Sequence, residues 1–271
     1  MRFVVGINLE VRMLGAFAID CNGQMIHGSL GSKGRLLAAY LLAYPNRMHR
    51  REFLTDLFWE NDESAGGRNA LNTALWRFRK TLSATLASPQ IRQLSVADEV
   101  MLEIKDASIV DIHKFQSLAK SLLDEKCQSL CSRDLLAELS DYQGLFLDGE
   151  EASWILEERE RLHCLYVRVL VKLMRRFASA RRYEDALECG RLVLREDPLR
   201  ELVQRSVILL YLLNGQQAEA IGQFDRFHHL LQTECDVKPM PETVALNELI
   251  RSGAVFQKIP ELTEEYFETS N

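Results

Sequence analysis

The residues best suited to chemistry lie in one stretch, GRNALNTALWRFRKTL, from Gly67 to Leu82. No acidic residue occurs between positions 63 and 98, although this interval contains several cations, namely Arg68, Arg77, Arg79, Lys80 and Arg92. At about 100° per residue, a helix here places its other polar side chains on one face, together with an indole: Asn69, Asn72, Thr73 and Trp76. Cationic side chains bind phosphates and amide side chains bind base edges. The stretch therefore predicts a helix that contacts DNA.

The opposite side of the same stretch is apolar at helical spacing, at Leu71, Leu75, Phe78 and Leu82. This stripe predicts an amphipathic helix that buries one face. Two other interpretations stay open: an ordinary solvated helix that packs on a second domain, and a Trp76 that serves only interdomain packing. A solvated face usually mixes both charge signs, whereas this one lacks acids over 34 positions, which favours DNA binding.

Charge is distributed unevenly along the chain. Residues 1–110 carry 13 Lys and Arg against 11 Asp and Glu, a net of +2, and the remainder carries 20 against 28, a net of -8. The overall charge of -6 disfavours indiscriminate coating of nucleic acid, because phosphates repel most of the surface. A local basic patch joined to an acidic second part remains compatible with specific binding.

Other chemistries find little support in the sequence. The six cysteines form no CxxC pair, which predicts reduced thiols without zinc. Residues 28–35, GSLGSKGR, outline a phosphate loop but lack a Gly directly before Lys33, and neither GxSxG nor HExxH occurs. We therefore expect no enzyme and no cofactor. The absence of a signal peptide or membrane helix predicts a cytoplasmic protein without a membrane partner.

The elements expected around the DNA-contacting helix form a winged helix. Short alternating strands at residues 9–28 surround the turn dipeptide Asn22-Gly23, and two helices follow, from Ser32 to Pro45 and from Arg50 to Trp59. After the acidic loop ENDESAGG and the Arg-rich helix, IRQLSV–ADE–VMLEI predicts a hairpin that turns at Asp98-Glu99. Residues 1–108 are thus predicted to be an α+β winged helix-turn-helix.

The remainder of the chain is predicted to be helical, so the fold class is mainly α. Ala186 and Ala220 occupy matching places in two segments 34 residues apart, which is the tetratricopeptide period. Residues 109–256 are therefore predicted to form an all-α, tetratricopeptide-like domain, and residues 257–271 an acidic, loose tail. Three uses of such a domain stay open: binding a protein partner, self-association and plain scaffolding.

One long stretch in the first half runs from GSKGRLLAAYLLAYPNRMHRREFLTDLFWE to NALNTALWRFRKTL. It resembles the OmpR/PhoB-type winged helix of the Streptomyces antibiotic regulatory protein (SARP) family. The second half resembles that family's bacterial transcriptional activator domain in several motifs: VDIHKF, YQGLFLDGEEASWILEERERL, RYEDALECGRLVLREDPLRE and VKPMPETVALNELI. The resemblance covers about residues 9 to 251, and its specificity comes from several motifs in the right order.

The resemblance implies an activator that binds direct-repeat sites in double-stranded DNA and recruits RNA polymerase. It also implies a homodimer, at least on DNA. Residues 68–82 would lie in the major groove, where Asn69, Asn72, Thr73 and Trp76 face bases. Phosphate contacts would come from Arg77, Arg79, Lys80, Arg50 and Arg51. The acidic loop, with Glu60, Asp62 and Glu63, would meet a basic surface of the polymerase, on its sigma factor or another subunit.

Two positions depart from the family pattern. Trp76 stands where relatives more often carry Arg or a small polar residue, and an indole cannot make the bidentate contact of Arg with guanine. The acidic wing tip would be repelled in a minor groove, so Arg92 is the better candidate for a wing contact. These departures keep one alternative function open, an adaptor that binds proteins through its helical repeats and whose winged helix does not read DNA.

Overall fold

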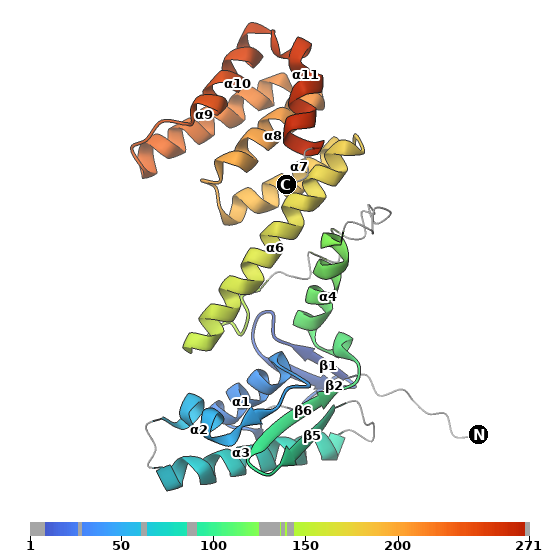
Figure 1. Cartoon of the computed structure of the whole chain (residues 1–271), viewed down its shortest axis with the longest axis vertical. Coiled ribbons are helices and arrows are strands. Elements are labelled where there is room, and N and C mark those ends of the chain that lie inside the picture. The colour runs from blue at the N-terminus through green and yellow to red at the C-terminus, as the bar shows by residue number, and fades with distance from the viewer. Residues whose placement is uncertain are drawn as a thin grey trace, which may run out of the picture. The chain divides into compact units, whose positions relative to one another are not determined.

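The computed structural model describes residues 9–26, 29–60, 64–85, 91–124, 136, 139 and 144–268 (Figure 1). The chain forms two compact units. Unit 1 contains residues 1–118 and 139–159, and unit 2 contains residues 119–138 and 160–271. Small sheets are confined to the N-terminal part and helices dominate the rest, which confirms the predicted fold class. The domain limits at 108 and 256 stay predictions.

Unit 1 begins with an antiparallel sheet of three strands, β1 (Leu9–Arg12), β2 (Ala18–Cys21) and β3 (Gln24–Met25). Side chains of β1 are alternately buried and exposed, since one face of the sheet covers the core. Cys21 pairs with Gln24, so Asn22 and Gly23 form a two-residue turn, with φ values of 56° and 84°. A type I′ turn requires positive φ at both positions, and the predicted turn is confirmed.

The winged helix follows, with α1 (Ser32–Ala43), β4 (His49–Arg50), α2 (Arg51–Trp59), α3 (Ser64–Thr85), β5 (Ile91–Val96) and β6 (Glu99–Ile104). Its antiparallel sheet has the order β4-β6-β5. α1 ends before Pro45, because the residue that precedes a proline disfavours helical geometry. α3 starts at Ser64, so Gly66 and Gly67 belong to the helix and not to the acidic loop.

The wing turns one residue earlier than predicted. Val96 pairs with Glu99, so the two turn residues are Ala97 and Asp98, and Ala97 adopts a φ of 49°. Glu99 is instead the first residue of β6. The alternation along β6 sets this register, because every second residue from position 100 to 104 is buried and Glu99 must then lie in the strand.

The start of α6 (Ser153–Ser179) packs on the winged helix within unit 1. The ring centroid of Trp154 lies 5.2 Å from that of Tyr40, 5.9 Å from Phe146 and 6.5 Å from Phe58, in edge-to-face arrangements. The Trp154 side chain is buried. Such pairs contribute about 0.5–1.5 kcal/mol beyond the burial of their area. This aromatic core therefore helps to position α1 and α2, and with them α3.

Arg159 closes the same packing region with hydrogen bonds. Its guanidinium donates to three backbone carbonyl oxygens at 2.7, 2.6 and 2.8 Å, those of Phe146, Leu147 and Glu150. We refer to residues 144–159 and the rings that they contact as the seam. No role was predicted for Trp154, whose only signal in the sequence is the family resemblance of residues 142–162. The alternating charges of residues 157–161 favour a solvated helix face, and this interpretation is wrong for Arg159, which binds three carbonyl oxygens, and for Glu158, which is buried.

A half-buried carboxylate joins the first sheet to α4 (Asp111–Leu123), which follows the short 3-10 helix η2 (Ala107–Ile109). Asp111 Oδ2 accepts hydrogen bonds from the backbone N–H groups of Met13 and Leu14, both at 2.8 Å. Burial raises the pKa of Asp111, although these hydrogen bonds act in the opposite direction. The first residue of α4 is thereby tied to the chain segment that leaves β1.

Beyond α6, unit 2 contains α7 (Tyr183–Glu196), α8 (Glu201–Leu213), α9 (Gln217–Glu234) and α10 (Pro241–Ser252). Ala186 in α7 and Ala220 in α9 are both 0% exposed. Arg181 and Gly215, again 34 positions apart, both have left-handed backbone conformations and precede these two helices. The predicted period is therefore present in the backbone as well as in the sequence.

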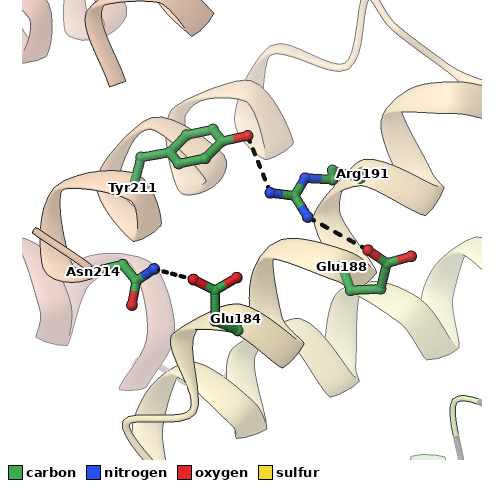
Figure 2. Close-up of polar contacts among 5 residues, drawn as sticks. All are labelled: Glu184, Glu188, Arg191, Tyr211 and Asn214. Carbon is green, nitrogen blue, oxygen red and sulfur yellow. Dashed lines mark hydrogen bonds and ion pairs between the residues drawn. The ribbon is translucent and has the colours of Figure 1, made fainter. Parts of the chain in front are cut away.

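Polar side chains join α7 to α8 (Figure 2). An Arg191 guanidinium nitrogen lies 3.4 Å from the Tyr211 hydroxyl, and another lies 3.5 Å from the Glu188 carboxylate. Asn214 donates a hydrogen bond to Glu184. Because these groups are partners of one another, we interpret the cluster as a link within the repeat.

The predicted loose tail is wrong for the residues that the structure describes. The chain is helical through α11 (Val255–Thr263) and a π-helical turn, η3 (Glu264–Glu268). Phe267 is buried, and the guanidinium of Arg205 in α8 lies 6.0 Å from the ring centroid of Tyr266. The acidic composition and Pro260 concealed a helical spacing of apolar residues in this segment. Packing on the rest of unit 2 makes the short helix stable.

Candidate nucleic-acid interface

α3 has the two faces that its sequence predicted. Leu71, Leu75, Phe78 and Leu82 are between 0% and 4% exposed. On the other side, every predicted DNA-contacting residue of the helix is exposed to solvent: Arg68, Asn69, Asn72, Thr73, Trp76, Arg77, Arg79 and Lys80. We refer to these eight residues as the polar face of α3. The face presents cations, amides and an indole, and no residue of α3 is acidic.

Gly67 lets α2 and α3 approach each other closely. A Cβ atom at this position would lie 2.8 Å from Thr55 Cγ2 and 3.5 Å from Trp59 Cβ, so a larger residue would push the helices apart. No role was predicted for Gly67, although a glycine inside an otherwise good helix is a signal for such a contact. The close approach brings the start of α2 beside the polar face of α3.

Arg51, the first residue of α2, contacts the polar face directly. Its Nη1 donates a hydrogen bond of 2.6 Å to Asn72 Oδ1. The backbone of Arg51 is held on both sides, since its N–H donates to the Asp98 carbonyl at 2.9 Å and its carbonyl accepts from the Thr55 hydroxyl at 2.8 Å. The Arg51 side chain, predicted to contact a phosphate, therefore also orients an amide that was predicted to contact a base.

Two further contacts shape the polar face. The Lys80 ammonium lies 4.9 Å from the Trp76 ring centroid, a distance at which a cation is attracted to the indole. Trp76 is 51% exposed, so its ring remains open to solvent beside the ammonium. The Thr73 hydroxyl donates to the Asn69 carbonyl at 2.8 Å, which leaves the methyl group and an oxygen lone pair of Thr73 for a partner.

Two predicted DNA-contacting cations outside α3 lie opposite carboxylates in the strand ladder. Arg50 in β4 is paired with Glu99, and Arg92 in β5 is paired with Glu103. Both arginines are exposed. Because directly paired residues have Cβ atoms about 4.5–5.5 Å apart, each carboxylate reduces the positive potential near its arginine. The wing is therefore a weaker attractor of phosphate than the polar face of α3.

The predicted polymerase-contacting loop can be placed only in part. Glu60 is exposed and directly follows α2. Asp62 and Glu63 lie outside the described residues, so the predicted contact of all three with RNA polymerase stays a prediction.

The described part of the chain contains no cluster of metal-ligating side chains. No group of three or more His, Cys, Asp and Glu side chains there could hold a metal ion. Cys127 and Cys131 lie outside the described residues. No described helix is long and apolar enough to cross a membrane.

Comparison with known proteins places this architecture among transcriptional regulators. Residues 110–251 match the family model of the bacterial transcriptional activator domain. The chain is 24% identical over 251 residues to the transcriptional regulatory protein MoaR1 of Mycobacterium tuberculosis, covering 88% of this chain and 78% of that protein. It is also 24% identical over 256 residues to the transcriptional regulatory protein EmbR of M. tuberculosis, covering 89% of this chain and 63% of that protein.

A solved structure shares the fold. The structure of M. tuberculosis EmbR in complex with a low affinity phosphopeptide superposes with a TM-score of 0.72 at 20% identity, over 91% of this chain and 66% of that chain. The chain thus spans about two thirds of the length of EmbR. From the matched domain and these relatives, the chain belongs to the SARP-type family of transcriptional activators that carry a bacterial transcriptional activator domain, a family of regulators and not of enzymes.

Proposed function

We propose that this protein activates transcription by binding specific sites in double-stranded DNA, with α3 in the major groove. The observation that supports this most is the polar face of α3, which offers cations and amides to solvent and no carboxylate. The major groove admits one α-helix, and each base pair presents a distinct pattern of donors and acceptors there. The family relation supports the same class of activity.

The residues divide into two groups by the chemistry of their side chains. Asn69, Asn72, Thr73 and Trp76 contact bases. Phosphate contacts come from the cations of α3, of the start of α2 and of the wing: Arg68, Arg77, Arg79, Lys80, Arg50, Arg51 and Arg92. The sites are direct repeats bound by two protomers side by side, and the protein acts in the cytoplasm.

Binding to duplexes selected from random DNA, followed by fluorescence anisotropy and titrated with salt, tests the DNA-binding role. We expect the native chain to enrich a direct repeat. The double variant Arg77→Ala/Lys80→Ala should lose about 1.8 from the log–log salt slope, at about 0.9 for each phosphate contact. The double variant Arg226→Ala/Lys238→Ala is the matched control, because it removes the same charge from exposed positions of unit 2.

Failure to enrich any site, or binding that is equally affected by both double variants, would contradict DNA reading by α3. The result would instead favour the adaptor function, in which the helical repeats of unit 2 bind a protein partner.

Recruitment of RNA polymerase is the second part of the proposal. Glu60 is exposed next to α2, and Asp62 and Glu63 follow in the sequence. Reversal of these three charges to Lys should abolish activation of a promoter in transcription with purified polymerase and leave promoter DNA bound at least as tightly. Undiminished activation would exclude this loop as the polymerase contact.

A further inference from the structure

The contact between Arg51 and Asn72 determines which end of the Asn72 amide faces the guanidinium. A guanidinium can only donate, so the Asn72 atom that lies 2.6 Å from Arg51 Nη1 is the carbonyl oxygen of its amide. The bond is charge-assisted, and such bonds are stronger than those between neutral groups. Asn72 is exposed, and its amide offers two N–H donors at the end away from the guanidinium, whereas its oxygen lies beside a cation.

The position of Arg51 is set by backbone contacts. Its N–H is held by the Asp98 carbonyl in the wing turn, and its carbonyl by the Thr55 hydroxyl one turn later in α2. The separation of α2 and α3 is set by Gly67, where any Cβ would meet Thr55. Because the backbone of Arg51 is already fixed, only its side-chain torsions have to be ordered when it holds Asn72 in one orientation.

We propose that Arg51 acts as a positioning residue for Asn72 and that the pair is specific for guanine. This inference rests on the proposed function, in which α3 occupies the major groove. Guanine presents two acceptors there, N7 and O6, whereas adenine presents one acceptor and one donor, thymine one acceptor and a methyl group, and cytosine one donor. With its oxygen held by Arg51, the Asn72 amide offers the base the two N–H donors of its NH₂ group, and this pattern matches guanine best.

Asparagine by itself has the opposite preference. It pairs with adenine by donating from its nitrogen to N7 and accepting from the N6 amino group at its oxygen. In this protein the amide oxygen already accepts from a cation, and an approaching amino group would meet the positive guanidinium. Arg51 thus changes the base that Asn72 selects without replacing Asn72 as the residue that contacts it.

The test begins with the best duplex selected by the native chain. The base pair that Asn72 contacts is the one at which Asn72→Ala no longer discriminates among the four bases. At this position we expect the native chain to prefer guanine to adenine by about tenfold to a hundredfold, the range for a good two-bond contact. Inosine keeps N7 and O6 and should bind like guanine, whereas 7-deazaguanine lacks N7 and should bind more weakly.

Arg51→Ala is the decisive variant, and it should shift the preference at this base pair from guanine toward adenine. Arg51→Met is a second variant that keeps the apolar stem and cannot donate, in case the alanine variant unfolds. Arg77→Ala serves as the comparison, since loss of a phosphate contact weakens binding to all four bases equally.

Three results would overturn the proposal. The native chain could prefer a base other than guanine at this position, or 7-deazaguanine could bind as well as guanine. Alternatively, both Arg51 variants could weaken all four duplexes equally, which is the behaviour of a phosphate contact alone. Failure of the proposed function itself gives a different result, because a native chain that does not read DNA would show no sequence preference at any position.

Discussion

The polar face of α3 and the seam of residues 144–159 use similar side chains in opposite ways. In the seam, Arg159 donates to three carbonyl oxygens, and the Tyr44 hydroxyl donates to the buried Glu158 carboxylate at 3.2 Å. On α3 the arginines and amides are exposed to solvent. Buried polar groups must be satisfied within the protein, whereas exposed ones can exchange water for a ligand. The first region therefore serves stability, and the second is available for binding.

Two tryptophans give the strongest test of this contrast. Trp154 is 7% exposed and Trp76 is 51% exposed. Trp154→Ala should lower the free energy of unfolding by about 3–5 kcal/mol, because it leaves a cavity among aromatic rings. Trp76→Ala should change it by less than about 0.5 kcal/mol and alter the preferred DNA site instead. Urea unfolding followed by circular dichroism measures the first effect, and site selection measures the second. Equal losses of stability would refute the contrast.

Two arginines sharpen the comparison at a smaller scale. Arg159→Met leaves carbonyl oxygens of the seam without a donor, which should destabilise the protein by about 1–3 kcal/mol. Arg191→Met removes a similar bridge in unit 2, where the side chain is 49% exposed, and should cost less than about 1 kcal/mol. Urea unfolding of both variants measures the two losses of stability. A larger loss for Arg191→Met would mean that burial does not determine the contribution of these bridges.

Arg77→Ala tests the polar face alone. It should reduce the log–log salt slope of DNA binding by about 0.9, because one phosphate contact is lost. The unfolding midpoint in urea should stay that of the native chain, since Arg77 is exposed on the side of α3 away from the core. A lowered midpoint with an unchanged salt slope would assign Arg77 to packing.

The smallest expected effect is a pH dependence of the free energy of unfolding, and it comes from a buried histidine. His49 is buried, and burial lowers its pKa from the ordinary 6.5, with Arg47 acting in the same direction and the contact to the Tyr44 carbonyl opposing them. Below pH 6.5 the unfolded chain then binds more protons at this residue than the folded chain, so stability falls as pH decreases. Urea unfolding between pH 7.5 and 5 should show this slope, and His49→Gln should reduce it. An unchanged slope in the variant would assign the effect to other groups.

Periodic patterns in the sequence were sufficient to predict the main elements. The stripe of Leu71, Leu75, Phe78 and Leu82 predicted the buried face of α3, and the Asn22-Gly23 dipeptide predicted its turn. The wing turn was misplaced by one residue, because the register depends on which face of β6 is buried. The helical tail was missed because the stability of its short helix comes from packing on unit 2.

By itself, the sequence determined which side chains are offered to a partner, since the acid-free stretch and its helical spacing are local properties of the chain. Only the tertiary structure decided how those side chains are oriented. Arg51 and Asn72 are 21 positions apart, and they meet because Gly67 permits two helices to approach and the wing holds the start of α2. Trp154 likewise packs on Tyr40 of the winged helix, which lies more than 100 positions away in sequence. Contacts between distant residues depend on the packing of whole elements, and no periodicity within a single element encodes them.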